Sequence, residues 1–82
     1  MHGPPPKRPA EKIRKHYVNT DYPEVLLRFE DGHEIRIPRG VAKSFDTYKG
    51  ETIKVMAIYD HTSSERVLVG SVRSDEMPDG EP

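Results

Sequence analysis

The segment Asp60–Glu65, with the sequence DHTSSE, holds the residue types of a hydrolytic site. His61 lies beside Asp60, and two serine hydroxyl groups follow closely in the chain. A catalytic triad, however, needs a base that an acid orients and that faces its nucleophile in space, which adjacency in sequence does not supply. A polar turn between two strands explains the segment better. We therefore expect no enzyme activity.

Metal and cofactor motifs are also missing from the sequence. The chain has no cysteine, and its four histidines, at positions 2, 16, 33 and 61, are too scattered for a metal-binding spacing. It contains neither a phosphate-binding loop nor the glycine pattern of a dinucleotide site. We expect no metal site and no cofactor, which leaves the binding of a macromolecule as the function to explain.

Basic side chains are the second group that could do chemistry, because they bind phosphates and guanine edges of duplex DNA. Six are candidates for such contacts: Arg28, Arg36, Arg39, Lys43, Lys7 and Arg8. The last two belong to an amino-terminal arm that could follow a groove of the duplex. Alternatively, Arg28 and Arg36 are solvated residues that pair with Glu30 and Glu34.

Charge is unevenly distributed along the chain. The net charge is −1, but residues 1–16 carry a net charge of +4 and residues 74–82 a net charge of −4. The near-neutral average argues against strong nonspecific binding of nucleic acid, although it does not exclude a local basic face.

Aromatic residues offer a third chemistry, the stacking of unpaired bases. The set is Tyr17, Tyr22, Phe29, Phe45, Tyr48 and Tyr59. Because Phe29 and Phe45 fall on predicted core faces, single-stranded nucleic acid is the weakest candidate partner.

The elements that must position these residues are mostly strands. Apolar residues alternate with polar ones in Glu24–Glu30 and His33–Pro38, whereas Thr52–Asp60 and Arg66–Arg73 are apolar on both faces. Strands of the second kind are usually buried on both faces, which favours a closed barrel or an intertwined dimer. The segment Ala10–Val18 fits either a helical turn or a leading strand.

An Asp-Gly pair between the first two strands predicts a hairpin, and the alignment of the apolar faces sets its loop length. A three-residue loop ending at Gly32 places Leu27 opposite Ile35. A two-residue loop would instead place Phe29 opposite Glu34. We therefore expect the three-residue loop, with its glycine in the left-handed conformation.

The stretch between Pro38 and Gly50 has helical spacing. Val41, Phe45 and Tyr48 fall at i, i+4 and i+7, on one side of a short helix. The proline ends the hydrogen bonding of the preceding strand, and the glycine suits a left-handed stop. The expected order of elements is therefore β-β-α-β-β.

Eight residues in and around this stretch form a pattern: Ile37, Pro38, Val41, Phe45, Lys49, Gly50, Glu51 and Ile53. Their order resembles the core signature of the AbrB/MazE-type swapped-hairpin β-barrel domain over residues 25 to 72. The resemblance implies an intertwined homodimer that binds DNA, as a transcription regulator or as the antitoxin of a toxin–antitoxin pair. It places the basic DNA-facing positions at Arg28, Arg36, Arg39 and Lys43.

We therefore expect one mainly β domain over residues 16–73, either a swapped-hairpin AbrB-like dimer or a monomeric SH3-like barrel. Residues 1–15 would be a basic, proline-rich flexible arm and residues 74–82 an acidic disordered tail. With neither a membrane-length apolar run nor a signal sequence, a cytoplasmic protein is expected.

The leading hypothesis for function is a non-enzymatic DNA-binding regulator or antitoxin-like protein. The alternative is a protein-interaction module that binds and modulates a partner through a sheet edge or an exposed apolar patch.

Overall fold

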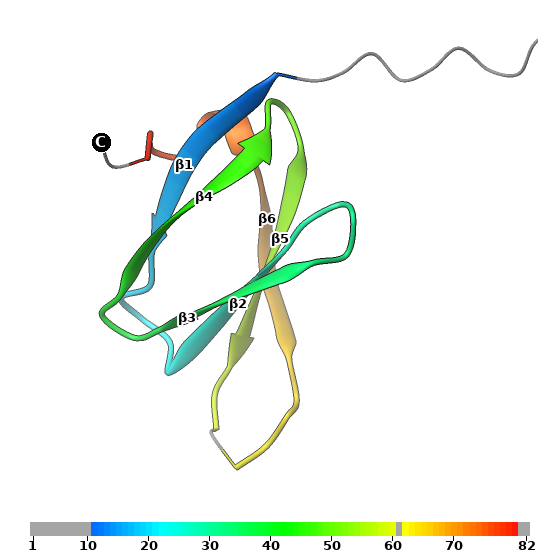
Figure 1. Ribbon diagram of the computed structural model, residues 1–82. Coiled ribbons are helices and arrows are strands. Elements are labelled where there is room, and N and C mark those ends of the chain that lie inside the picture. The colour runs from blue at the N-terminus through cyan, green and yellow to red at the C-terminus, as the bar shows by residue number, and fades with distance from the viewer. Residues whose placement is uncertain (1–10, 61, 81–82) are drawn as a thin grey trace, which may run out of the picture.

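The computed structural model describes residues 11–60 and 62–80, which form six strands, one short 3-10 turn and no α-helix. The strands are β1 Lys12–Val18, β2 Glu24–Arg28, β3 Glu34–Pro38, β4 Ala42–Tyr48, β5 Thr52–Ile58 and β6 Val67–Arg73. They form a two-stranded sheet, β1-β4, and a four-stranded sheet in the order β3-β2-β5-β6 (Figure 1). The predicted mainly β class is confirmed. In the described part of the chain, no helix is long and apolar enough to cross a membrane.

The first predicted hairpin is confirmed in its register as well as its existence. Leu27 lies opposite Ile35 in the β2–β3 pair. The amide of Phe29 donates to the carbonyl of His33 at 2.9 Å, and Gly32 has a φ of 94°, in the left-handed region. The alternation of apolar residues was sufficient here because a shift of one residue would move every side chain to the opposite face.

The predicted helix is wrong, because the stretch forms strand β4. All seven of its residues pair with β1 in antiparallel register, so the order β-β-α-β-β does not occur. In the strand, Phe45 and Thr47 point inward and are buried, whereas Tyr48 is 50% exposed. Residues with β-branched and aromatic side chains favour a pleated strand. A short helix would have had to form against the cost of nucleation.

Strand β1 resolves the alternative left open for the segment before Val18, since it is a leading strand and not a helical turn. The expectation that the last two predicted strands are buried on both faces holds for β5 only. Met56 and Ile58 of β5 are buried, but β6 lies at the edge of its sheet, where Leu68 is 58% exposed.

The main core lies where the two sheets face each other. Its fully buried members come from three strands of the larger sheet: Val25, Leu27, Ile37 and Ile53. From the smaller sheet, Phe45 packs edge-to-face against Phe29 with ring centroids 5.4 Å apart. Burial of these side chains within one chain supplies the main stabilising term of the fold.

The segment after β6 packs against β1, where we expected a disordered tail. Met77 belongs to the main core, and the amide of His16 donates to the carbonyl of Pro78 at 3.0 Å. The Lys15 ammonium pairs with the Asp79 carboxylate at 2.9 Å. Acidic composition was therefore a poor guide here, because one buried methionine and several backbone hydrogen bonds position the segment. The predicted basic arm lies largely in residues 1–10, outside the described residues.

Candidate functional site

The four-stranded sheet has an outer face, which points away from the core. Two neighbouring rows of paired residues cross it. From β3 to β6, the charged row is Glu34, Arg28, Lys54 and Ser71. In the same direction, the second row begins with Arg36 of β3 and continues with three apolar residues, for which we call it the apolar row: Leu26, Met56 and Leu68.

Positive charge predominates on this outer face. Its charged residues, with the acidic groups that pair with them, are Arg28, Arg36, Lys54, Arg66, Arg73, Glu24, Glu34 and Asp75, which give a net charge of +2. The whole chain, by contrast, has a net charge of −1. The outer face therefore attracts anionic groups, although the molecule as a whole does not.

Glu34 holds two of these arginines. Arg28 donates to its Oε2 atom from Nε and from Nη2, at 2.9 and 2.7 Å, and Nη1 of Arg66 donates to the same atom at 2.9 Å. The hydrogen bonds from Arg28 and the positive charge of Arg66 lower the pKa of Glu34. The carboxylate thus stays ionised at neutral pH and cross-links β2, β3 and the residue that precedes β6.

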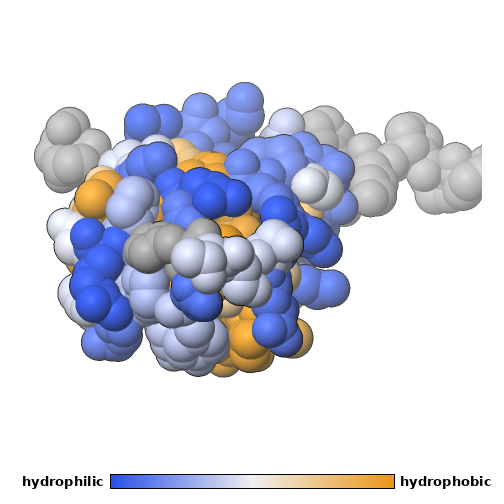
Figure 2. Space-filling view, turned by 90° about the horizontal axis from the view of Figure 1, so that it is seen from below, coloured by the Kyte–Doolittle hydropathy of each residue, from blue (hydrophilic) through white to orange (hydrophobic). Residues whose placement is uncertain are grey.

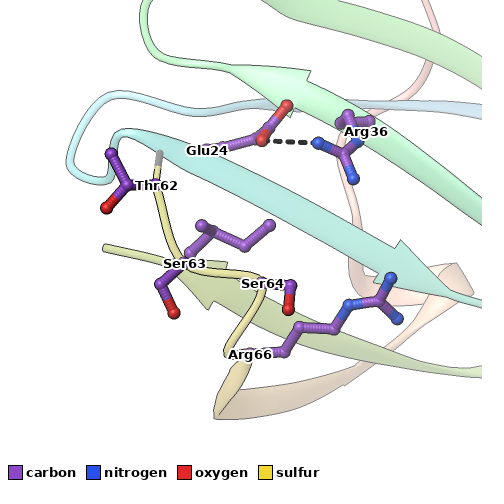
Figure 3. A pocket seen from close by; sticks show the side chains of 7 residues that line it. Glu24, Arg36, Thr62, Ser63, Ser64 and Arg66 are labelled. Carbon is purple, nitrogen blue, oxygen red and sulfur yellow. Dashed lines mark hydrogen bonds and ion pairs between the residues drawn. The ribbon is translucent and has the colours of Figure 1, made fainter. Parts of the chain in front are cut away.

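Arg66 also covers part of the outer face. Its ion pair with Glu34 of β3 joins opposite sides of the sheet, and its side chain extends along the outer face from the residue before β6 (Figure 3). The same sheet holds a second small cluster of buried apolar residues, Leu26, Met56 and Ile58, and Ile58 lines a pocket together with Arg66. The aliphatic stem of an arginine covers apolar surface well while its head group stays hydrated.

The other candidate DNA-contacting residues are engaged with neighbours in the chain. Nη1 of Arg36 pairs with Glu24 at 2.8 Å, and Nη2 of Arg39 donates to the carbonyl of Asp21 at 3.3 Å. The Lys43 ammonium donates to the carbonyl of Arg36 at 2.7 Å. The structure thus brings three of these cations together around β3, each with an internal partner.

Arg28 lies on the same outer face and pairs with Glu34, as the alternative of solvated ion pairs predicted. Glu30, the second predicted partner, instead accepts a hydrogen bond from the amide of Thr52. Lys7 and Arg8 lie outside the described residues.

A pocket of about 310 Å³ opens at one end of the outer face, beside the β5–β6 connection (Figure 3). Its lining residues are Glu24, Arg36, Ile58, Thr62, Ser63, Ser64 and Arg66. Within the connection, the carboxylate of Asp60 accepts two hydrogen bonds from Thr62, both at 2.9 Å. This is the arrangement of a polar turn. His61, the candidate base, lies outside the described residues.

The aromatic side chains are divided between the core and the surface. Phe29 and Phe45 are buried as predicted, and the exposed Tyr59 packs edge-to-face against Tyr22 at 5.6 Å. Tyr48 is exposed on the other sheet. The exposed tyrosines therefore lie on different sheets and do not form a single row that successive bases could follow.

The β6 edge is the least protected part of the larger sheet. In the described part of the chain, backbone groups of β6 form hydrogen bonds with β5 alone. At the opposite edge, β3 is partly covered, since Lys43 donates to one of its carbonyls. Exposed apolar side chains follow one another along β6: Val67, Leu68 and Val69. Seen from the end with the β5–β6 connection, apolar patches reach the surface among hydrophilic side chains (Figure 2).

Three residues of this surface were not selected from the sequence: Lys54, Arg66 and Leu68. Because β6 has apolar residues on both faces, the sequence predicted a buried strand, and we did not expect β6 to lie at an exposed edge. The position of Arg66 on the outer face depends on an ion pair with a residue 32 positions away. No local pattern in the sequence reports such a contact.

Comparison with protein-family models, with curated proteins and with solved structures found no match to this chain.

Proposed function

We propose that this chain is a non-enzymatic protein-interaction module that binds an extended segment of a partner protein along the edge of β6. The observation that carries the proposal is the open backbone of this strand, combined with the 58% exposure of Leu68. An extended peptide can add a strand to such an edge, so that main-chain hydrogen bonds give affinity and side-chain contacts give specificity.

Protection of the edges at β1 and, in part, at β3 supports this choice. Edge strands attract unwanted pairing, and proteins usually cover them or place charged residues along them. Here the segment after β6 covers β1, whereas Val67, Leu68 and Val69 leave β6 apolar and exposed. An uncovered apolar edge in a chain that covers β1 and part of β3 is best explained by a partner that occupies it.

The finer fold assignment is part of the same proposal. We favour a monomeric SH3-like barrel over an intertwined swapped-hairpin dimer. The main core closes within one chain, with Val25, Leu27, Ile37 and Ile53 fully buried, so the core itself requires no second copy.

The first prediction concerns the edge itself. Peptides selected from a display library by the wild-type protein should bind the Leu68→Lys variant at least about tenfold more weakly, because charge on an edge strand opposes strand addition. Val18→Lys is the matched control. It places the same charge on a residue that is 46% exposed in the other sheet, and its affinity should be unchanged.

Isothermal titration calorimetry of the three proteins measures this difference, and circular dichroism checks that each is folded. Equal affinity of the wild type and Leu68→Lys would contradict the proposal. Self-association that Leu68→Lys abolishes, without any peptide binding, would identify a second copy as the occupant and also overturn it.

Duplex DNA is the second candidate partner, and the net charge of +2 on the outer face favours it. Salt bridges to Glu24 and Glu34 weaken the case, because phosphates would have to compete with them for Arg36 and Arg28. We therefore rank DNA below a protein partner.

The second prediction tests the DNA hypothesis. If Arg36, Arg39 and Lys43 each neutralise one phosphate, affinity should fall roughly 40-fold between 50 and 200 mM salt. A double variant, Arg36→Ala with Arg39→Ala, should then lose most of the binding. Arg14→Ala, which removes an exposed cation from the other sheet, should not. Fluorescence anisotropy with a labelled duplex measures both effects, and binding that is absent or independent of salt rules out this candidate.

A further inference from the structure

We infer that the segment bound at β6 carries an acidic residue and an apolar residue two positions apart, facing the outer side of the sheet. This inference rests on the proposed function and specifies its partner. The acidic residue would lie opposite Ser71 and the apolar residue opposite Leu68, so that each extends one of the two rows that already cross the sheet.

Lys54 supplies the charge that selects the acidic residue. It is the one cation on the outer face that makes neither a side-chain hydrogen bond nor an ion pair within residues 11–60 and 62–80. Its neighbour Arg28 repels it from one side. Its neighbour on the other side is Ser71, whose short side chain leaves room for the Lys54 ammonium to extend toward the sheet edge.

The distances allow this contact. Neighbouring strands lie about 4.8 Å apart, so an added strand would place its backbone about 10 Å from that of Lys54, with β6 between them. An extended lysine spans most of this gap, and the side chain of an aspartate or glutamate spans the rest. Opposite charges on a sheet face attract, and like charges in the same arrangement repel.

Leu68 sets the apolar position. It is the last residue of the apolar row, next to the buried Met56, and the side of Leu68 that points away from Met56 is exposed. An apolar residue on the added strand would cover it and exclude water from the end of the row.

A bulge in β6 sets the spacing. The pairing with β5 shifts between Val55 and Met56, so that Leu68 and Ser71 lie opposite residues only two apart. In a bulge, two residues of one strand lie opposite a single residue of the regular partner strand. A regular incoming strand should therefore meet Leu68 and Ser71 with residues two positions apart, although these are three apart in β6.

The third prediction tests this inference with synthetic peptides. The probe is a seven-residue peptide with glutamate and leucine two residues apart in a threonine background, made in both orders. Its counterpart has lysine in place of glutamate. At low salt the acidic peptide should bind roughly fivefold more tightly than the basic one, as expected for exchanging attraction for repulsion in a partly exposed pair. Titration followed by NMR chemical shifts measures both affinities.

A charge reversal in the protein completes the test. Lys54→Glu should invert the preference, whereas Lys12→Glu, which makes the same charge change on an exposed residue of β1, should leave it unchanged. Equal binding of the two peptides, or an unchanged preference in Lys54→Glu, overturns the acidic motif but leaves strand addition intact. If neither peptide shifts the resonances of β6, the motif is wrong. If library-selected peptides also fail to distinguish Leu68→Lys, the proposed function is wrong as well.

Discussion

Phe45→Ala is expected to lower the free energy of unfolding by about 4 kcal/mol, the usual cost of removing a buried aromatic side chain from a core. Phe45 links the two sheets by its edge-to-face contact with Phe29. A domain of this size has a total stability on the order of 5 to 10 kcal/mol, so the loss would leave it close to unfolding at room temperature. Urea denaturation followed by circular dichroism measures the change.

Tyr48→Ala is the matched control, because it distinguishes the observed strand from the expected helix. On a helix, Tyr48 would share the buried face of Phe45, and both substitutions would be costly. On β4 the tyrosine is half exposed, and its removal should cost less than about 1 kcal/mol. Comparable losses for the two variants would contradict the strand.

Glu51→Ala should lower the free energy of unfolding by about 3 kcal/mol. The carboxylate accepts hydrogen bonds from the Thr47 hydroxyl at 2.7 Å and from the amides of Glu30 and Tyr48 at 2.9 and 3.1 Å. It therefore joins the β2–β3 loop to the β4–β5 turn. Hydrogen bonds to a charged group are worth more than neutral ones, and the substitution leaves these donors without their acceptor. Glu51→Gln, which keeps the shape of the side chain, should lose less.

Glu51 also predicts the direction of a pH effect. Burial raises the pKa of this carboxyl group, but the hydrogen bonds from Thr47, Glu30 and Tyr48 outweigh burial and lower it. A group whose pKa is lowered in the folded state stabilises the fold above its unfolded pKa of about 4.3. That contribution is lost as the pH falls through the pKa that Glu51 has in the folded state. The stability difference between wild type and Glu51→Gln should accordingly be constant near neutral pH and shrink in acid; a difference that grows in acid would contradict this role.

Local sequence patterns predicted the β2–β3 hairpin correctly. They did not predict strand β4, because its conformation depends on pairing with a strand that is distant in sequence. Alternation and the position of Gly32 determine the hairpin register, because the two strands are adjacent in sequence. The stretch around Phe45 satisfies both a period of 3.6 and a period of two. What makes it a strand is β1, a partner that lies some 30 residues earlier in the chain.

The candidate site was predictable only in part, for the same reason. Basic residues on the strands were visible in the sequence, and the pairing of Arg28 with Glu34 follows from the hairpin register. The exposure of Leu68, and the lack of a partner for Lys54 among the described residues, depend on which strand lies at the edge and on the bulge in β6. Both features belong to the assembled sheet and leave no trace in local composition.

Amide hydrogen exchange of the β6 residues, measured with and without a peptide selected by the wild-type protein, tests the central claim most directly. Strand addition would give the outward-pointing amides between Val67 and Arg73 new hydrogen-bond partners. We predict that these amides exchange at least about tenfold more slowly in the complex, while those of β3 are unchanged. Protection confined to β3, or to the arginines around it, would contradict the account and move the binding surface to the opposite edge of the sheet.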